Sequence, residues 1–242
     1  MPPNCIAIIP ARGGSKRLPG KNLRHLGGLP LIGWTIRVAK AAGVFSRIVV
    51  STDDPATADA ALVLGAEVPW LRSSENSSDT ATSIQVVHEV LRRLLEDENY
   101  HPDAVMLLQP TSPFRSREML REALRRYEAS GNQSVVSVSP ASPPPQWCFT
   151  VSDNGELYPW NKDAPLLRSQ DTPPVYCLNG SLYLGSATTL LGTSSFYSEH
   201  TQALVVDNEV QSLDIDTPFD FMVAETAVAN GLAKPEDYPC PA

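Results

Sequence analysis

The chain has 242 residues, which suits one large domain or one domain with a modest insertion. Its formal net charge of -8 argues against sequence-independent nucleic-acid binding, because such binding needs a basic surface. Hydrophobic residues make up 42% of the chain, as in a folded domain, but no apolar run approaches the ~20 residues of a membrane span. We therefore expect neither a nucleic-acid partner nor a membrane partner.

The cysteines are dispersed along the chain, at Cys5, Cys148, Cys177 and Cys240. No two of them have CxxC spacing and no histidine pair lies near them, which argues against a zinc site and against a disulfide framework. Reduced thiols favour a cytoplasmic location. No basic region followed by a longer apolar stretch opens the sequence, so we expect no signal peptide.

Short apolar runs alternate with stretches of helical period along the chain. Short continuous runs are typical of strands buried on both faces, whereas apolar residues three or four positions apart predict helices. In chain order the patterns predict a strand at 5–9, a helix through Ile32, Ile36 and Ala39 that stops at Gly43, a strand at 47–51, a helix from Pro55 to about Leu64, a helix at 80–98, a strand at 104–108, a helix through Leu120, Leu124 and Tyr127, strands at 134–139, 181–184 and 203–206, and a last helix that opens at Thr217.

Local signals mark several helix ends. Asp54 precedes Pro55 and predicts an N-cap followed by a first-turn proline. Thr217 and Asp220 have the spacing of a capping box. The helix at 80–98 has the clearest amphipathic pattern. Its apolar face comprises Ile84, Val87, Leu91 and Leu94, and the charged residues expected largely off that face are Glu89, Arg92, Arg93 and Glu96.

Residues 140–178 differ from the rest, because they are rich in proline and lack a clear period. Aromatic residues continue through them, which indicates an insertion or lid rather than a linker. Repeated strand–helix units predict an α/β fold with three α/β/α layers, Rossmann-like, around a mostly parallel sheet. Ligands on such sheets bind beyond the carboxyl ends of the strands. The loops after Ile9, Ser51, Leu108 and Leu213 are therefore the expected site.

A glycine-rich basic loop, residues 10–22, follows the first predicted strand. It carries Arg12, Lys16, Arg17 and Lys21, with Gly13, Gly14 and Gly20 among them and the neutral donors Ser15 and Asn22. Fixed cations and exposed backbone N–H groups are what a triphosphate requires. GxxxxGK[ST] and GxGxxG are both absent, which argues against a P-loop ATPase and a dinucleotide-binding site. The alternative is an ordinary solvated turn.

Asp214 and Asp216 flank Ile215 at the end of an apolar stretch. In an extended segment, residues two apart point to the same side, so the two carboxylates would repel each other. Magnesium removes that conflict, and it binds one or two carboxylates together with water and substrate phosphates. We therefore expect Mg²⁺ on this pair; a turn or helix-cap cluster is the alternative. Asp53 is a second metal candidate, whereas Asp54 is the expected helix cap.

Four segments in the same order resemble the CMP-sialic acid synthetases (acylneuraminate cytidylyltransferases), a family that includes CMP-legionaminate-type enzymes. They are IPARGGSKRLPGKN at 9–22, VSTDD at 50–54, LLQPTSPFR at 107–115 and SLDIDTPFD at 212–220. The resemblance spans nearly the whole chain and implies a nucleotidyltransferase fold. It implies one domain, 1–242, with a lid, dimerisation and sugar-binding insertion at approximately 140–200. It also implies a homodimer and Mg²⁺ on Asp214 and Asp216.

The resemblance further implies which residues contact which substrate. Expected contacts to CTP come from Arg12, Gly13, Ser15, Asn22, Arg72, Ser83 and Gln109. Expected contacts to the sugar come from Gln109, Arg168, Asn179, Tyr183, Phe196 and Tyr197, with the two last reaching into a neighbouring subunit. The alternative for Ser83 is a helix hydroxyl that contacts no ligand. The alternative for Phe196 and Tyr197 is a pair of core or interface aromatics. The chain departs from the family at Trp147, Cys177 and Ser169, the last of which shifts the register of Arg168.

The expected reaction is transfer of CMP from CTP to the anomeric hydroxyl of a nine-carbon 2-keto sugar acid of the sialic-acid type, with release of pyrophosphate. The expected catalytic residues are Arg12, Lys16, Lys21, Asp214 and Asp216. The cations would stabilise charge on the transferred and leaving groups. Three alternatives remain: a cytidylyltransferase for pseudaminic or octulosonic acid, a non-catalytic sugar-nucleotide sensor of the same fold, and a glycosyltransferase.

Overall fold

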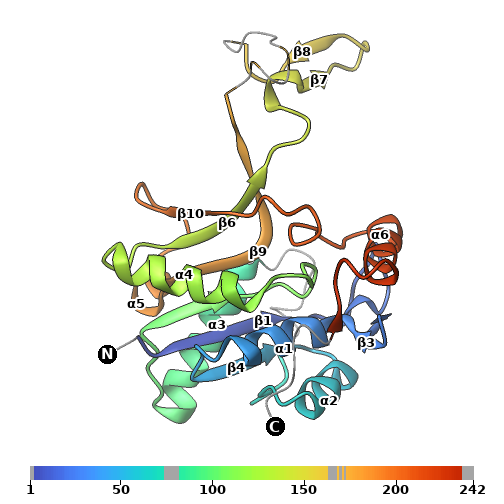
Figure 1. The fold of residues 1–242 in the computed structure, drawn as a ribbon. Helices are drawn as coiled ribbons and strands as arrows, with labels where there is room; N and C mark the ends of the chain where they lie inside the picture. The colour runs from blue at the N-terminus through green and yellow to red at the C-terminus, as the bar shows by residue number, and fades with distance from the viewer. Residues whose placement is uncertain (1–2, 74–81, 163–167, 169–170, 172, 236–242) are drawn as a thin grey trace.

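The computed structural model describes residues 3–73, 82–162, 168, 171 and 173–235. A six-stranded sheet runs through this part of the chain (Figure 1). From edge to edge its strands are β10 (Gln202–Val205), β6 (Val135–Pro140), β9 (Tyr176–Ser186), β5 (Ala104–Leu107), β1 (Cys5–Pro10) and β4 (Arg47–Ser51). β9 is antiparallel to both of its neighbours, and the other described pairings in this sheet are parallel. The predicted mostly parallel sheet is confirmed.

Alternate residues of the central strands enter two separate hydrophobic cores. In β1, Cys5, Ala7 and Ile9 belong to one core, whereas Ile6 and Ile8 belong to the other. The first core is covered by α1 (Leu31–Ala42), α2 (Pro55–Val63), α4 (Arg117–Ala129) and α6 (Pro218–Ala229). The second is covered by α3 (Ser83–Glu98) and α5 (Ala187–Gly192). The predicted three-layer α/β/α architecture follows from this alternation.

Side chains and glycines end the helices where the local signals predict. Gly43 closes α1 with a φ of +64°, a left-handed conformation that favours glycine. Asp54 caps α2 by accepting a hydrogen bond from the Thr57 N–H at 3.0 Å. Thr217 and Asp220 form the predicted capping box of α6. Helix α3 begins at Ser83 behind a Thr82 cap; residues 80 and 81 of the predicted helix lie outside the described residues.

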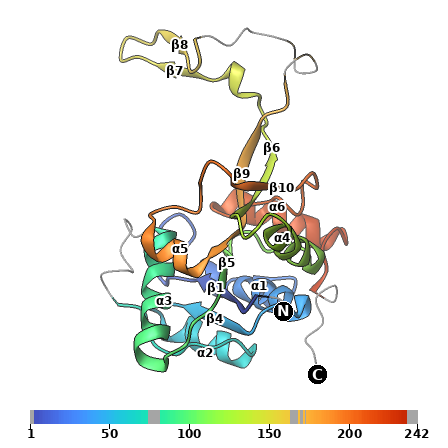
Figure 2. The ribbon, with the colours of Figure 1, turned by 90° about the vertical axis from the view of Figure 1, so that its left-hand side faces the viewer.

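Between β6 and β9 the chain leaves the sheet as a projecting arm (Figures 1 and 2). The arm contains the short 3-10 helix η3 (Pro145–Trp147) and a hairpin of β7 (Phe149–Val151) and β8 (Leu157–Pro159). Its exposed apolar side chains include Trp147, Tyr158 and Trp160. The chain rejoins the main sheet within β9, so the projecting part is shorter than the predicted insertion at 140–200.

The first loop and α1 are joined by three short elements. These are the 3-10 helix η1 (Lys21–Leu23) and the strand pair β2 (His25–Leu26) and β3 (Leu29–Pro30). Gly20 precedes η1 with a φ of +65°. These elements return the chain from the end of β1 to the first core, so the basic loop is anchored at both of its ends. Among the described residues, no helix combines the length and apolar character of a membrane span.

The described cysteines differ in their expected reactivity. Burial raises the pKa of the Cys5 thiol to about 12, while Cys148 and Cys177 are free and exposed. Only the thiolate reacts with alkylating agents. We expect iodoacetamide at pH 8 to modify Cys148 and Cys177 in the native protein and to leave Cys5 unmodified. Peptide mass mapping measures this, with urea-unfolded protein as the control in which Cys5 reacts; native labelling of Cys5 would contradict its burial.

Candidate functional site

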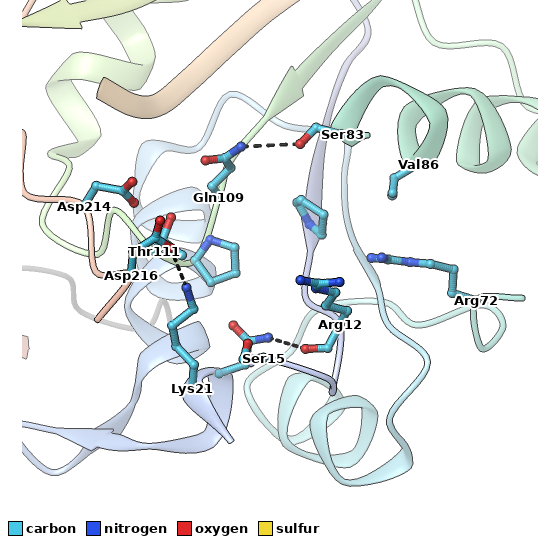
Figure 3. A pocket seen from close by; sticks show the side chains of 13 residues that line it. Arg12, Ser15, Lys21, Arg72, Ser83, Val86, Gln109, Thr111, Asp214 and Asp216 are labelled. Carbon is cyan, nitrogen blue, oxygen red and sulfur yellow. Dashed lines mark hydrogen bonds and ion pairs between the residues drawn. The ribbon is translucent and has the colours of Figure 1, made fainter. Parts of the chain in front are cut away.

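A cavity of about 260 Å³ lies beyond the carboxyl ends of β1, β4 and β5 (Figure 3). Ligands of doubly wound sheets bind at this edge. The residues that line it come from four separate parts of the chain: Pro10, Arg12, Ser15, Lys21 and Asn22; Arg72, Ser83 and Val86; Gln109, Pro110 and Thr111; Asp214 and Asp216. We call this the first cavity. Of the predicted catalytic residues, Arg12, Lys21, Asp214 and Asp216 line it, whereas Lys16 is exposed and does not.

The glycine-rich loop is held by hydrogen bonds from outside and within. The Gly13 N–H donates to Asp53 Oδ1 at 2.9 Å, and the Asn22 amide donates to the Arg12 carbonyl at 2.9 Å. A Cβ at Gly13 would lie 2.8 Å from Cβ of Asp54, so the loop and the start of α2 are in close contact. Asp53, the second metal candidate, therefore fixes the loop backbone, and it does not line the first cavity.

We expect Asp53→Ala to raise the KM for a triphosphate substrate by about tenfold, because the hydrogen bond that fixes the Gly13 N–H is lost. Asp53→Asn retains an acceptor for the Gly13 N–H and should stay close to wild type. Steady-state kinetics of the three proteins measure this. An equally severe loss in Asp53→Asn would instead indicate that the carboxylate charge is needed at a metal.

The opposite side of the first cavity carries the two aspartates (Figure 3). Residues 213–216 do not form a strand, contrary to the expectation that a strand ends at Leu213. The segment is fixed instead by the Ile215 N–H, which donates to the Thr111 carbonyl at 2.8 Å, and by the Asp216 N–H, which donates to Asp220 Oδ2 at 3.0 Å. Ile215 is buried, and both flanking carboxylates line the cavity.

Two cations of the basic loop contact Asp216. Arg17 donates to Asp216 Oδ2 at 2.7 Å, and Lys21 donates to Asp216 Oδ1 at 3.0 Å and to the Ile215 carbonyl at 2.9 Å. Desolvation raises the pKa of Asp214, and repulsion from Asp216 adds to this, while Thr111 and Lys21 oppose it. The cavity thus brings cations and carboxylates within reach of one another.

The donor set fits a magnesium ion that is shared with a substrate. No cluster of three or more possible metal-ligating side chains occurs in the part of the chain that the structure describes. Asp214 and Asp216 nevertheless line one cavity together with Lys21 and Arg12. Mg²⁺ commonly binds one or two carboxylates and fills its remaining positions with water and phosphate oxygens. Two carboxylates facing a basic loop match that pattern.

Arg72, Ser83 and Val86 line the first cavity on the side away from the aspartates (Figure 3). Arg72 is buried; its Nε donates to Ser51 Oγ at 3.0 Å and its Nη2 donates to the Ser51 carbonyl. Gln109 lies between the two sides, and its Nε2 donates to Ser83 Oγ at 3.4 Å. Ser83 thus has a side-chain partner at the cavity, and its predicted ligand contact stays a prediction.

A second cavity of about 190 Å³ shares Ser83 and Gln109 with the first. Tyr183, Phe196 and Tyr197 form its aromatic wall. The Tyr183 ring centroid lies 5.7 Å from that of Phe196 and 6.4 Å from that of Tyr197. Burial raises the pKa of Tyr183, so its hydroxyl stays protonated near neutral pH. The wall offers apolar surface and neutral hydroxyls, which suits a ligand with both methyl and polar groups.

Two predicted sugar-binding residues line neither cavity. Asn179 is buried between β6 and β9, where its Oδ1 accepts from Ser137 Oγ at 2.6 Å and from the Ser181 N–H at 3.1 Å, and its Nδ2 donates to Ser139 Oγ at 2.8 Å. Its amide therefore stabilises the strand pairing. Arg168 is exposed and precedes β9 in the arm. The predicted sugar contacts of both residues stay predictions.

Two residues of the segment at 107–115 have roles that the sequence pattern did not reveal. The Thr111 carbonyl holds Ile215, and its side chain hydrogen-bonds Asp214. Arg115 is fully buried; its Nη1 donates to Thr35 Oγ1 at 2.8 Å and its Nη2 to the Gln109 carbonyl at 2.5 Å. Both residues belong to a segment that carries the family resemblance. Only their contacts in the structure show that Arg115 fixes Gln109 and that Thr111 fixes the aspartate segment.

Comparison with known proteins identifies the family of the chain. The family model described as cytidylyltransferase matches residues 6–230. The chain is 44% identical over 220 residues to CMP-N,N'-diacetyllegionaminic acid synthase of Legionella pneumophila, covering 91% of this chain and 94% of that protein. It is 37% identical over 219 residues to N-acylneuraminate cytidylyltransferase of Streptococcus agalactiae, covering 90% of this chain and 51% of that protein.

A solved structure shares the fold at low sequence identity. It is that of CMP:2-keto-3-deoxy-manno-octonic acid synthetase complexed with CTP, with a TM-score of 0.69 and 18% identity over 94% of this chain and 99% of that one. The predicted nucleotidyltransferase fold is therefore confirmed. The family match over most of the chain confirms the predicted resemblance as well. The chain belongs to the cytidylyltransferase family, whose members are nucleotidyltransferase enzymes.

Proposed function

We propose that this protein transfers CMP from CTP to the anomeric hydroxyl of a nonulosonic acid and releases pyrophosphate. The observation that carries the proposal is the pair of adjoining cavities that share Gln109 and Ser83. The first cavity has the cations and carboxylates that a metal-bound triphosphate needs, and the second has an aromatic wall suited to an acylated sugar. A transfer between two substrates requires such adjoining sites.

In this mechanism the chain acts by positioning and electrostatics. Arg12 and Lys21, which line the first cavity, bind phosphate oxygens and stabilise the charge that develops on the leaving pyrophosphate. Asp53 fixes the backbone of the basic loop by accepting a hydrogen bond from the Gly13 N–H. Gln109, at the boundary of both cavities, orients the sugar hydroxyl towards the α-phosphorus. Lys16 is placed in the same loop and is proposed to reach the triphosphate from the rim.

Asp214 and Asp216 would hold Mg²⁺, which supplies neutralisation of phosphate charge when bound. The two aspartates lie on the side of the cavity reached by Lys21 (Figure 3). Lys21 and Arg17 form ion pairs with Asp216, which places both cations beside the carboxylates that would hold the ion.

The proposed sugar is a sialic- or legionaminic-type nine-carbon 2-keto acid. Support comes from the 44% identity to a CMP-N,N'-diacetyllegionaminic acid synthase and from the second cavity, which Tyr183, Phe196 and Tyr197 line. N-acyl groups of such sugars present both a methyl and an amide, which this wall can contact.

We also propose a cytoplasmic homodimer. The projecting arm exposes apolar and aromatic side chains such as Trp147, Phe149 and Trp160, which a second copy of the chain would cover. The described cysteines are unpaired, as in a reducing compartment. Light scattering on purified protein measures the mass, and a monomeric mass at micromolar concentration would contradict the dimer.

The reaction is tested by pyrophosphate release with CTP, Mg²⁺ and, in separate wells, N-acetylneuraminic, legionaminic, pseudaminic or octulosonic acid. Sugar-dependent release with CTP but not with ATP, UTP or GTP is the expected result, strongest with legionaminic or N-acetylneuraminic acid. Omission of Mg²⁺ with EDTA present should abolish it. If folded protein binds CTP but releases no pyrophosphate with any of the four sugars, the result would favour a non-catalytic sensor. If the protein does not bind CTP, the result would contradict the proposed role of the first cavity in nucleotide binding.

A further inference from the structure

Strands β6 and β9 pair irregularly beside the two cavities. The register shifts between two residue pairs, Val138 with Leu178 and Val136 with Tyr183. Residues 179–182 of β9 therefore stand opposite the single residue Ser137 of β6, as a bulge. A bulge takes backbone groups out of the regular ladder, and buried groups of this kind need other hydrogen-bond partners. Ser137 is fully buried and lines neither cavity, so the proposed reaction does not use it directly.

The Ser137 hydroxyl supplies hydrogen-bond partners to this bulge. Its Oγ accepts from the Leu182 N–H at 2.9 Å and donates to Asn179 Oδ1 at 2.6 Å, the shorter of two acceptors within reach. Asn179 Oδ1 also accepts from the Ser181 N–H at 3.1 Å. One hydroxyl thus connects the first and the last residue of the bulge. Its loss would leave the buried Leu182 N–H without this acceptor and Asn179 with one donor fewer.

The bulge lies against Gln109, the side chain that stands between the two sides of the first cavity (Figure 3). The backbone of Gly180 passes so close that a Cβ there would lie 2.9 Å from Gln109 Oε1. Ser112 makes a second connection, because its Oγ donates to the Asn179 carbonyl at 3.4 Å and its N–H donates to the Gln109 carbonyl at 3.3 Å. The positions of the bulge and of Gln109 are therefore linked on two sides.

The bulge also sets the register of Tyr183. This residue follows the bulge directly and pairs with Val136 of β6 and with Leu107 of β5. Its ring belongs to the aromatic wall of the second cavity. A change of register by one residue would turn the side chains of β9 to the opposite face of the sheet. A fixed bulge therefore determines where two side chains of the second cavity lie, those of Gln109 and Tyr183.

We propose that Ser137 is a positioning residue for the sugar substrate: its hydroxyl fixes the bulge of β9, and the bulge holds Gln109 and Tyr183 at the second cavity. This inference rests on the proposed function, in which the second cavity binds the sugar. Ser137 itself contacts neither substrate. It acts through the backbone of β9 and through the Asn179 amide.

The nucleotide side of the site is fixed by other contacts. Lys21 donates to Asp216, and Arg72 donates to Ser51. None of these four residues belongs to β6 or β9. Loss of the hydroxyl at position 137 should therefore weaken sugar binding and sugar orientation much more than it weakens CTP binding.

The test is Ser137→Ala, which removes only the hydroxyl. We expect the KM for the accepted sugar to rise by about tenfold and kcat to fall by a similar factor, because Gln109 and Tyr183 are held less firmly. The Kd of CTP in the absence of sugar, measured by calorimetry, should change by less than about twofold. Ser137→Thr keeps a hydroxyl and should recover most of the loss in sugar KM.

Two control variants separate positioning from a general loss of stability. Tyr127→Phe removes a buried hydroxyl from a separate cavity, which His101 also lines. It should lower the melting temperature by a few degrees, as Ser137→Ala does, and leave the sugar KM and the CTP Kd at wild-type values. Ser134→Ala removes a hydroxyl immediately before β6, outside the bulge, and should match wild type in all three measurements.

Four results would overturn the inference. The first is a wild-type sugar KM and kcat in folded Ser137→Ala protein. The second is an equal loss in sugar KM and in CTP Kd, which a general loosening of the fold predicts. The third is a Ser137→Thr protein with a restored melting temperature but no recovery of the sugar KM. If Ser137→Ala does not fold, Ser137→Cys decides, since a thiol is of similar size but a weak hydrogen-bonding group, and a normal sugar KM in it is the fourth.

Failure of the proposed function itself would look different. Wild-type protein that releases no pyrophosphate with any of the four sugars would contradict the proposed function before any variant is compared.

Discussion

Asp216→Ala is expected to lower kcat by about a thousandfold while the protein stays folded, because a carboxylate proposed to hold Mg²⁺ at the transferred phosphate is removed. The same change leaves Lys21 and Arg17 without their carboxylate partner in the first cavity. CTP binding without metal should consequently be retained or become tighter. Turnover at saturating CTP and Mg²⁺, together with calorimetric binding of CTP in EDTA, measures both effects.

Asp207→Ala is the matched control, since Asp207 is an exposed aspartate of the same part of the chain that lines neither cavity. It should match wild type. Asp214→Ala should resemble Asp216→Ala in turnover. Near-normal kcat in a folded Asp216→Ala protein would show that the metal assignment is wrong.

Lys21→Met is expected to lower kcat by about a hundredfold, through the loss of one cation in the first cavity. Lys21 is well placed for this, because its side chain is 11% exposed and its Nζ lies 3.0 Å from Asp216 Oδ1 and 2.9 Å from the Ile215 carbonyl. Methionine fills a similar volume and should preserve the packing. Steady-state turnover with CTP and the accepted sugar measures the loss.

Lys21→Arg keeps the charge and should recover part of the rate, although a guanidinium does not reproduce a compact ammonium. Lys234→Met, an exposed lysine that lines neither cavity, is the control and should match wild type. A loss in Lys21→Met that appears only in KM, with kcat unchanged, would contradict a role in the transition state.

Elements whose signals are local were predictable from the sequence. Strands β1 and β4 follow from continuous apolar runs, and the starts of α2 and α6 follow from Asp54 and from the Thr217–Asp220 pair. The basic loop was also identified, because glycines and cations coincide directly after a strand. In these cases the residues that determine the conformation lie within a few positions of it.

Features that depend on distant contacts were not predictable. Glu89 was expected largely off the apolar face of its helix, but it is buried and accepts a hydrogen bond from the Ser73 N–H. Asp214 and Asp216 were expected after a strand, yet their segment is fixed by Thr111, about a hundred residues earlier. Asn179 was expected at the sugar, and the sequence did not reveal that its amide also forms hydrogen bonds with the hydroxyls of Ser137 and Ser139. To predict any of these contacts, one must know which distant segment of the chain packs against the residue in the folded protein.

Gly180 lies in the main sheet where the arm returns, and it packs against a side chain that lines both cavities. It lies in β9 opposite the register shift between Val136 and Val138, and its φ is +74°. A Cβ there would lie 2.9 Å from Oε1 of Gln109, the side chain that both cavities share. A substitution at position 180 would therefore strain the backbone and displace Gln109 at once, and through Gln109 it would alter both cavities. Glycine is therefore the residue that position 180 requires if both cavities are to keep their shape.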